Sequence, residues 1–219
     1  MTFKAPDSLA EQIAHHLAER IIRGELKPGE RIQEQKVTAA LNVSRGSVRE
    51  ALLVLERRHL IVILPRRGAQ VSVLTPHNIT SLCALMSELY ILLGLAVARS
   101  WQEQTDLAPF LQIQQRLIAS CERKDVKGFV EDSFNVMRAA YPFADNPYLE
   151  ETVENLQPSM SRFYYLALEQ RKAEMSEYLT LFGQLLEAVI ARDLSRIREV
   201  LTCYAERSCQ SVLSALAAS

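Results

Sequence analysis

Two short helical segments joined by a three-residue turn are the feature that most constrains the fold of this chain. Residues 34–41 carry apolar side chains at helical spacing, and a second helical pattern covers residues 45–58. Asn42-Val43-Ser44 between them leaves room only for a tight turn, and serine is a preferred residue for capping the helix that follows. The sequence therefore predicts a helix-turn-helix.

The flanking segments extend this pair to a larger unit. A helix over residues 8–23 is predicted by a capping box at its start and apolar residues at four-residue steps, and Gly24 ends it. After the helix-turn-helix, two β-rich runs at 60–64 and 69–73 flank the turn Pro65-Arg66-Arg67-Gly68. Three helices and a hairpin predict a winged helix-turn-helix, with two arginines at the tip of its wing.

The charge of the chain is unevenly distributed. Residues 1–75 hold 12 Lys and Arg against 8 Asp and Glu, a formal charge of +4, whereas the remainder carries −5 and the whole chain −1. A basic segment can face a polyanion, and an acidic one is repelled by it. The N-terminal segment is therefore the part expected to meet nucleic acid.

The second helix of the pair begins with the side chains that a DNA-reading helix needs. The major groove admits one helix and presents base edges to small, polar and arginine side chains at the start of that helix. Gly46 keeps bulk away from the bases. Taken singly, each arginine is typical of a solvated surface, but the turn, the cap and the wing together favour DNA binding. The residues expected to contact DNA are Lys36, Ser44, Arg45, Ser47, Arg49, Arg66, Arg67 and Gly68.

The pattern of the remaining residues predicts helices only, so the expected fold class is mainly α. We expect a winged helix-turn-helix over residues 1–75, followed by an all-α bundle of about six helices over residues 76–219. The third of these helices is expected to stop before Pro142, because proline lacks the N–H that continues a helix. The six helices are expected at 76–101, 106–123, 125–141, 147–169, 173–192 and 193–216. No secretory signal or run of about 18 apolar residues is found, and the four cysteines match no zinc or redox spacing. A cytoplasmic protein with no membrane segment is expected.

Residues 8–73 resemble the GntR-type winged helix. The segments that carry the resemblance are Gly24-x-Leu26-x-Pro28-Gly29, Val43-Ser44-Arg45-x-x-Val48-Arg49-Glu50-Ala51-Leu52 and Arg67-Gly68-Ala69-x-Val71. The resemblance implies that Arg45, Ser47 and Arg49 contact an operator and that the Arg67-Gly68 tip enters the minor groove. One departure is that Gln35 stands where relatives often have arginine, and Lys36 is its nearest cationic substitute.

Residues 78–214 resemble, more faintly, the FCD ligand-binding domain of FadR-type regulators, through Gly94-Leu95-Ala96, Asn146-Pro147-x-Leu149 and Ala191-Arg192-Asp193. Six helices favour the VanR-like branch. Many relatives hold a divalent metal with an aspartate and several histidines, and these positions fall on Glu131, Asn135, Phe182 and Tyr204 here. We therefore expect no metal or cofactor, and either an apolar effector cavity or a packed core that binds nothing. The candidate lining residues are Leu89, Leu93, Asn135, Arg138, Phe182 and Tyr204.

These observations predict a DNA-binding transcription regulator that binds an inverted-repeat operator as a homodimer. The resemblance to the GntR family implies that it is a repressor released by a small molecule. A ligand-responsive activator and a helical interaction module without an effector remain alternatives. An enzyme is not expected, since the sequence has no Gly-rich phosphate loop, nucleophile elbow or His/Cys/Asp cluster in its helical part.

Overall fold

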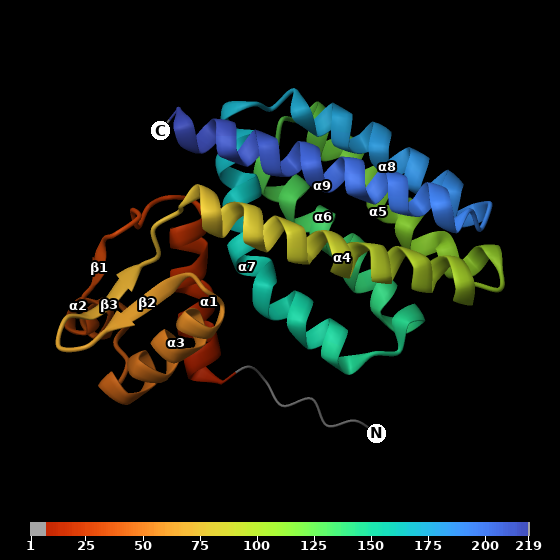
Figure 1. Cartoon of the computed structure of the whole chain (residues 1–219). Coiled ribbons are helices and arrows are strands. Elements are labelled where there is room, and N and C mark those ends of the chain that lie inside the picture. The colour runs from red at the N-terminus through yellow and green to blue at the C-terminus, as the bar shows by residue number, and fades with distance from the viewer. Residues whose placement is uncertain (1–7, 219) are drawn as a thin grey trace, which may run out of the picture. The chain divides into compact units, whose positions relative to one another are not determined.

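The computed structural model describes residues 8–218. It forms two compact units, which meet between Leu74 and Thr75. Unit 1 holds three helices and a small sheet, and unit 2 holds the remaining helices (Figure 1). The predicted mainly α fold, with a winged helix-turn-helix followed by a helical domain, is confirmed.

Unit 1 is built around α1 (Leu9–Ile22), α2 (Glu34–Leu41) and α3 (Arg45–Arg57). The turn between α2 and α3 is as short as predicted: Asn42 adopts a left-handed conformation with φ 51°, and the Ser44 hydroxyl accepts a hydrogen bond from the Ser47 N–H at 3.1 Å. Apolar residues of all three helices and of the sheet form one core. This core fixes the angle between α2 and α3, because close-packed side chains leave few alternative arrangements.

The sheet of unit 1 has three strands in the order β1-β3-β2. β2 (Ile61–Leu64) and β3 (Gly68–Val71) form the predicted antiparallel hairpin, with Leu64 opposite Gly68. β1 (Arg31–Ile32) pairs with the outer side of β3 and was not predicted, because a two-residue strand gives no alternation pattern. The wing is therefore supported along both sides of its central strand.

Unit 2 contains the six predicted α-helices and one short 3₁₀ helix (Gln104–Leu107) within residues 75–218. The α-helices are α4 (Pro76–Ser100), α5 (Ala108–Glu122), α6 (Val126–Ala144), α7 (Pro147–Gln170), α8 (Glu174–Ile190) and α9 (Leu194–Ala217). The expected end of α6 before Pro142 is wrong, since the helix continues to Ala144 and ends at Asp145, which has φ 44°. Proline removes one hydrogen bond of the helix there, and tertiary packing along α6 outweighs that loss.

The long helix α4 runs alongside α9 (Figure 1). A Cβ built on Gly94 would lie 3.0 Å from Leu201 Cδ1 and 3.2 Å from Ile197 Cγ2, so glycine permits this close approach. By length and composition α4 could also cross a membrane, with a mean hydropathy of 1.9, but 44% of that window is buried and the helix also packs against α6, α7 and α8. Such packing is typical of the core helix of a helical bundle.

Candidate functional site

The start of α3 presents the predicted DNA-contacting residues at the surface of unit 1. Arg45 and Arg49 are exposed, and Ser47 is half-buried, with its hydroxyl 2.9 Å from that of Ser44. The Arg49 side chain is 69% exposed and its Nε lies 3.1 Å from Glu34 Oε2 at the start of α2. Lys36, on the same helix as Glu34, is exposed. The helix-turn-helix thus brings two arginines and a lysine to the surface beside the free N–H groups at the start of α3.

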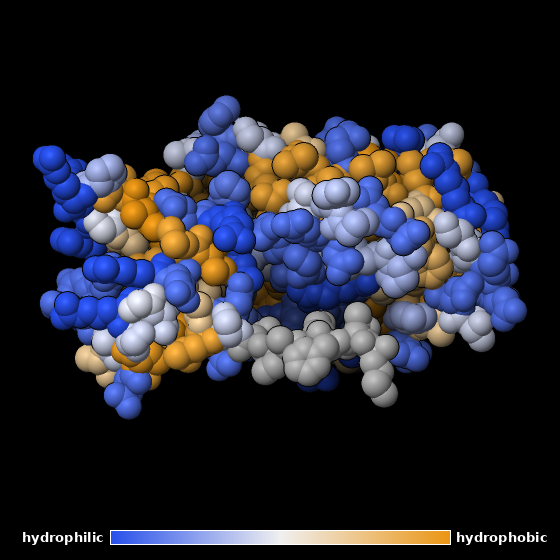
Figure 2. All heavy atoms as spheres, turned by 90° about the horizontal axis from the view of Figure 1, so that it is seen from below, coloured by the Kyte–Doolittle hydropathy of each residue, from blue (hydrophilic) through white to orange (hydrophobic). Residues whose placement is uncertain are grey.

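The wing adds a second basic group. The β2–β3 register leaves a three-residue loop, in which Arg66 has φ 62° and Arg67 is exposed. Gly68 follows with φ 77°, a conformation that side chains rarely adopt. In Figure 2, hydrophilic side chains project from the edge of unit 1 at the left of the view, the side on which Figure 1 shows the wing.

Arg31 is a wing residue that the sequence did not single out. Its guanidinium lies against Gly68. A Cβ built on Gly68 would be 3.8 Å from Arg31 Nη2, which is an ordinary van der Waals contact. Only the pairing of β1 with β3 brings it to the wing. No local pattern could have revealed this, because 36 residues of chain lie between Arg31 and Gly68.

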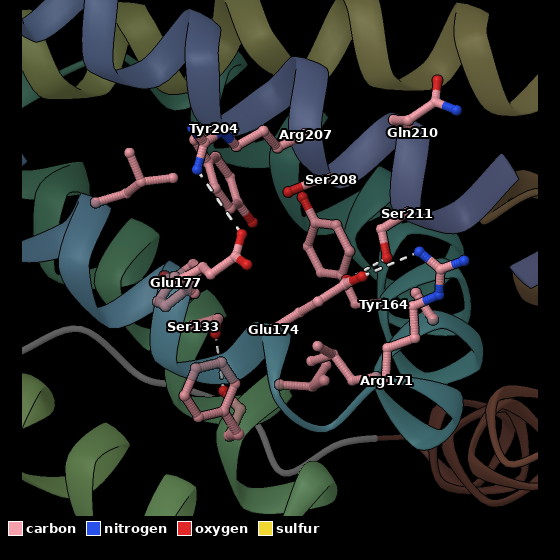
Figure 3. A pocket seen from close by; sticks show the side chains of 16 residues that line it. Ser133, Tyr164, Arg171, Glu174, Glu177, Tyr204, Arg207, Ser208, Gln210 and Ser211 are labelled. Carbon is pink, nitrogen blue, oxygen red and sulfur yellow. Dashed lines mark hydrogen bonds and ion pairs between the residues drawn. The ribbon is translucent and has the colours of Figure 1, made fainter. Parts of the chain in front are cut away.

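Unit 2 contains a cavity of about 280 Å³ between α6, α7, α8 and α9 (Figure 3). Its wall combines four aromatic rings, several hydroxyls and four charged side chains. The polar and aromatic members of the wall are Phe129, Ser133, Tyr164, Arg171, Glu174, Glu177, Tyr178, Tyr204, Arg207, Ser208, Gln210 and Ser211. Apolar surface makes up the larger part of this wall, and charged and hydroxyl groups are set among it.

The predicted effector residues are distributed over several sites. Tyr204 lines the large cavity. Leu93 and Phe182 line a smaller apolar cavity of about 40 Å³. Leu89, Asn135 and Arg138 line neither, and the Arg138 guanidinium pairs with Glu154 of α7 at 3.0 Å. Of the predicted set, Tyr204 is thus the residue that meets the large cavity.

The tyrosines of the cavity contact one another. The Tyr204 ring meets those of Tyr164 and Tyr178 edge to face. Burial raises the pKa of Tyr164, Tyr178 and Tyr204 above the ordinary value of 10.0. The phenols therefore remain protonated, and the cavity is polar without being anionic at its aromatic wall.

Comparison with known proteins agrees with both units. Residues 9–71 match the family of bacterial regulatory proteins named gntR, and residues 86–207, more than half of the chain, match the FCD domain. The chain belongs to the GntR-family regulators that carry an FCD domain. These family matches confirm the prediction of a DNA-binding transcription regulator. They also confirm the prediction that the protein is not an enzyme.

Individual relatives support the same assignment over most of their length. The transcriptional repressor RspR of Escherichia coli is 27% identical over 210 residues, which cover 92% of this chain and 88% of RspR. The gluconate operon transcriptional repressor of Bacillus licheniformis is 29% identical over 172 residues, covering 78% and 69%. The structure of E. coli McbR/YncC superposes with a TM-score of 0.80 at 23% identity, covering 95% of this chain and 99% of McbR, and so shares the fold.

The metal site implied for many FCD domains does not fit the residues of this GntR-family regulator. The Phe182 ring has no donor atom, and the Asn135 amide already donates to Asp132 at 3.1 Å and accepts from Arg138 at 3.1 Å. Within residues 8–218, no group of three or more His, Cys, Asp and Glu side chains is placed to hold a metal ion. A divalent metal needs several convergent ligands, which these positions do not supply.

Proposed function

We propose that this regulator is a repressor of the FadR subfamily and its VanR-like branch, binding an inverted-repeat operator in the cytoplasm as a homodimer. The exposed arginine-bearing start of α3, beside the basic wing, is the observation that carries the DNA-binding part of the proposal. The six α-helices of unit 2 within residues 75–218 support the VanR-like branch. The repressor assignment is supported by relatives named as repressors.

The operator contacts are assigned to two groups of side chains. Arg45, Ser47 and Arg49 would meet base edges and phosphates in the major groove, since arginine pairs with guanine in two hydrogen bonds. Lys36 and Ser44 would contact the adjacent backbone. The wing residues Arg66, Arg67 and Gly68 would reach into the minor groove. Phosphate contacts would position the protein, and the α3 contacts would supply the sequence preference.

Dimer formation is supported by one exposed face of α4. Leu85, Leu89 and Leu92 follow one another at helical spacing, and Leu85 and Leu92 are 46% and 53% exposed. A two-fold axis across such a face would bury the same stripe from both copies. Light scattering should therefore show a dimer for the wild type and a monomer for Leu85→Glu combined with Leu92→Glu. Tyr148→Glu, which alters a highly exposed ring on α7, should remain dimeric.

We propose that the effector binds in the 280 Å³ cavity. Four helices meet around it, so an occupant would alter their packing and with it the arrangement of a dimer. If the bound ligand weakens operator binding, DNA must weaken ligand binding by the same factor. Native mass spectrometry of the full-length protein should reveal a small organic mass on the dimer, and Ser208→Trp, which fills the cavity, should abolish it. An unchanged mass on Ser208→Trp would place the ligand elsewhere.

The operator assignment is tested by selecting bound sequences from a random DNA library and measuring their affinity by fluorescence anisotropy. Arg45→Ala combined with Arg49→Ala should weaken binding about 30-fold or more, taking at least 1 kcal/mol for each arginine. The matched control is Arg20→Ala combined with Arg23→Ala, which removes the same charge from an ion-paired region of α1. Equal losses in both variants would mean that α3 is not the recognition helix.

A further inference from the structure

The large cavity is surrounded by aromatic rings that contact one another in series. Phe129 and Tyr178 meet edge to face with centroids 5.2 Å apart, and Tyr178 and Tyr204 do so at 5.3 Å. Tyr164 joins them through Tyr204, at 6.4 Å. These rings come from α6, α7, α8 and α9, so all four helices contribute to the aromatic wall. Aromatic faces carry negative electrostatic potential and attract cations.

The charged side chains of the cavity form two ion pairs. Glu174 lies 3.4 Å from Arg171, and Glu177 lies 3.7 Å from Arg207. Glu174 also accepts a hydrogen bond from the Ser211 hydroxyl (Figure 3). Its side chain is 28% exposed, whereas that of Arg171 is 49% exposed. The carboxylate of Glu174 is therefore the most enclosed charge in the cavity, and its partner Arg171 is more exposed to solvent.

We propose that the effector is a small organic amine, held as an ammonium ion between Glu174 and the rings of Tyr164, Tyr178 and Tyr204. This inference rests on the proposed effector cavity and adds the charge of its occupant. A cation gains from both the carboxylate and the aromatic faces. An anion would gain from neither, and would have to compete with Glu174 for Arg171 or with Glu177 for Arg207 to find a positive partner.

The Arg171 guanidinium is the competitor of such a ligand. Its long side chain can turn into solvent without loss of backbone structure, whereas Glu174 is shorter and is tied to Ser211. An ammonium group would replace Arg171 beside the carboxylate, so the charges in the cavity would still sum to zero. An anion added to the two ion pairs would make the cavity negative overall. The Ser133, Ser208 and Ser211 hydroxyls can hold polar substituents of the ligand. A volume of about 280 Å³ lies at the lower end for ligand pockets, which indicates a small metabolite.

The inference is tested by calorimetric titration of the full-length dimer with three probes that share one shape. Phenethylammonium is the cation, phenylpropionate the anion and phenylethanol the neutral compound. Phenethylammonium should bind at millimolar concentration or below and more tightly than the other two. Glu174→Gln should weaken it roughly tenfold, and Arg171→Ala should strengthen it because the competing cation is removed. Glu169→Gln, which makes the same chemical change in an exposed pair with Lys172, is the matched control and should bind as the wild type does.

Two results would overturn the inference. Tighter binding of phenylpropionate, weakened by Arg171→Ala, would show an anion site in the same cavity, and the proposed effector cavity would stand. Failure of phenethylammonium to bind wild-type protein at millimolar concentration would also refute the amine. Tyr178→Leu distinguishes a ring contribution from simple charge pairing, since it should weaken binding of phenethylammonium more than binding of the neutral phenylethanol. If the wild-type protein binds no operator, the proposed function is refuted instead, whichever of the three probes binds in the cavity.

Discussion

The ion pair between Glu34 and Arg49 restrains a residue that is proposed to read DNA. Arg49 Nε and Glu34 Oε2 are 3.1 Å apart, and the arginine must leave or share this partner when it meets the operator. We predict that Glu34→Gln strengthens operator binding. An exposed ion pair contributes about 0.2–1 kcal/mol, which corresponds to a gain in affinity of about 1.4- to 5-fold.

The same substitution should lower the stability of the free protein. Glu34 lies in the first turn of α2, where a carboxylate interacts favourably with the helix dipole. Its loss should cost about 0.3–1 kcal/mol. Tighter DNA binding together with lower stability against urea would distinguish release of Arg49 from a general improvement of the protein.

A double-mutant cycle measures the contribution of the pair itself. Operator affinity is measured by fluorescence anisotropy for the wild type, Glu34→Gln, Arg49→Ala and the double variant, at several salt concentrations. Removing a negative charge near phosphates also helps without Arg49, and the cycle subtracts this shared effect. The reasoning is refuted if Glu34→Gln gives no gain, or if its gain is the same when Arg49 is already alanine.

Three further predictions concern stability and pH. Gly94→Ala should lower the free energy of unfolding by about 1 kcal/mol in urea denaturation. The new Cβ would meet buried α9 side chains at 3.0 and 3.2 Å, and this crowding outweighs the gain in helix propensity. A stabilised variant would contradict the close approach of α4 and α9. Ser44→Ala should cost about 1 kcal/mol through loss of the α3 cap and should also weaken operator binding, whereas unchanged stability would show that the cap is dispensable. The raised pKa values of Tyr164, Tyr178 and Tyr204 give a stabilisation that is complete below their ordinary pKa of 10.0 and is lost as the pH rises above it. The reason is that the unfolded phenols then release protons that the folded ones keep. A free energy of unfolding that stays constant above pH 10.0 would contradict this.

Unit 1 could be predicted from the sequence because short-range interactions specify it. The Ser44 cap, the tight turn at Asn42-Val43-Ser44 and the glycine-bearing wing turn each act within a few residues, and the structure places all three as the pattern indicated. The exposed positions of Arg45 and Arg49 follow from the helix repeat once the buried face of α3 is known. The exception is Arg31, whose place at the wing depends on β1 pairing with a strand far along the chain.

In unit 2 the sequence by itself determined the number of helices and most of their ends, through periodicity, caps and proline at the boundaries. Pro142 misled it, because a helix held by packing on its neighbours tolerates the loss of one hydrogen bond. The cavity was decided only by tertiary structure. Its charged wall joins Arg171 and Glu174, beside the α7–α8 connection, with Ser211 of α9, and no local pattern relates residues so distant in the chain. Asn135 and Arg138 share a helix with the cavity residue Ser133, yet neither lines the cavity, because the rotation of a helix about its axis is set by the bundle around it.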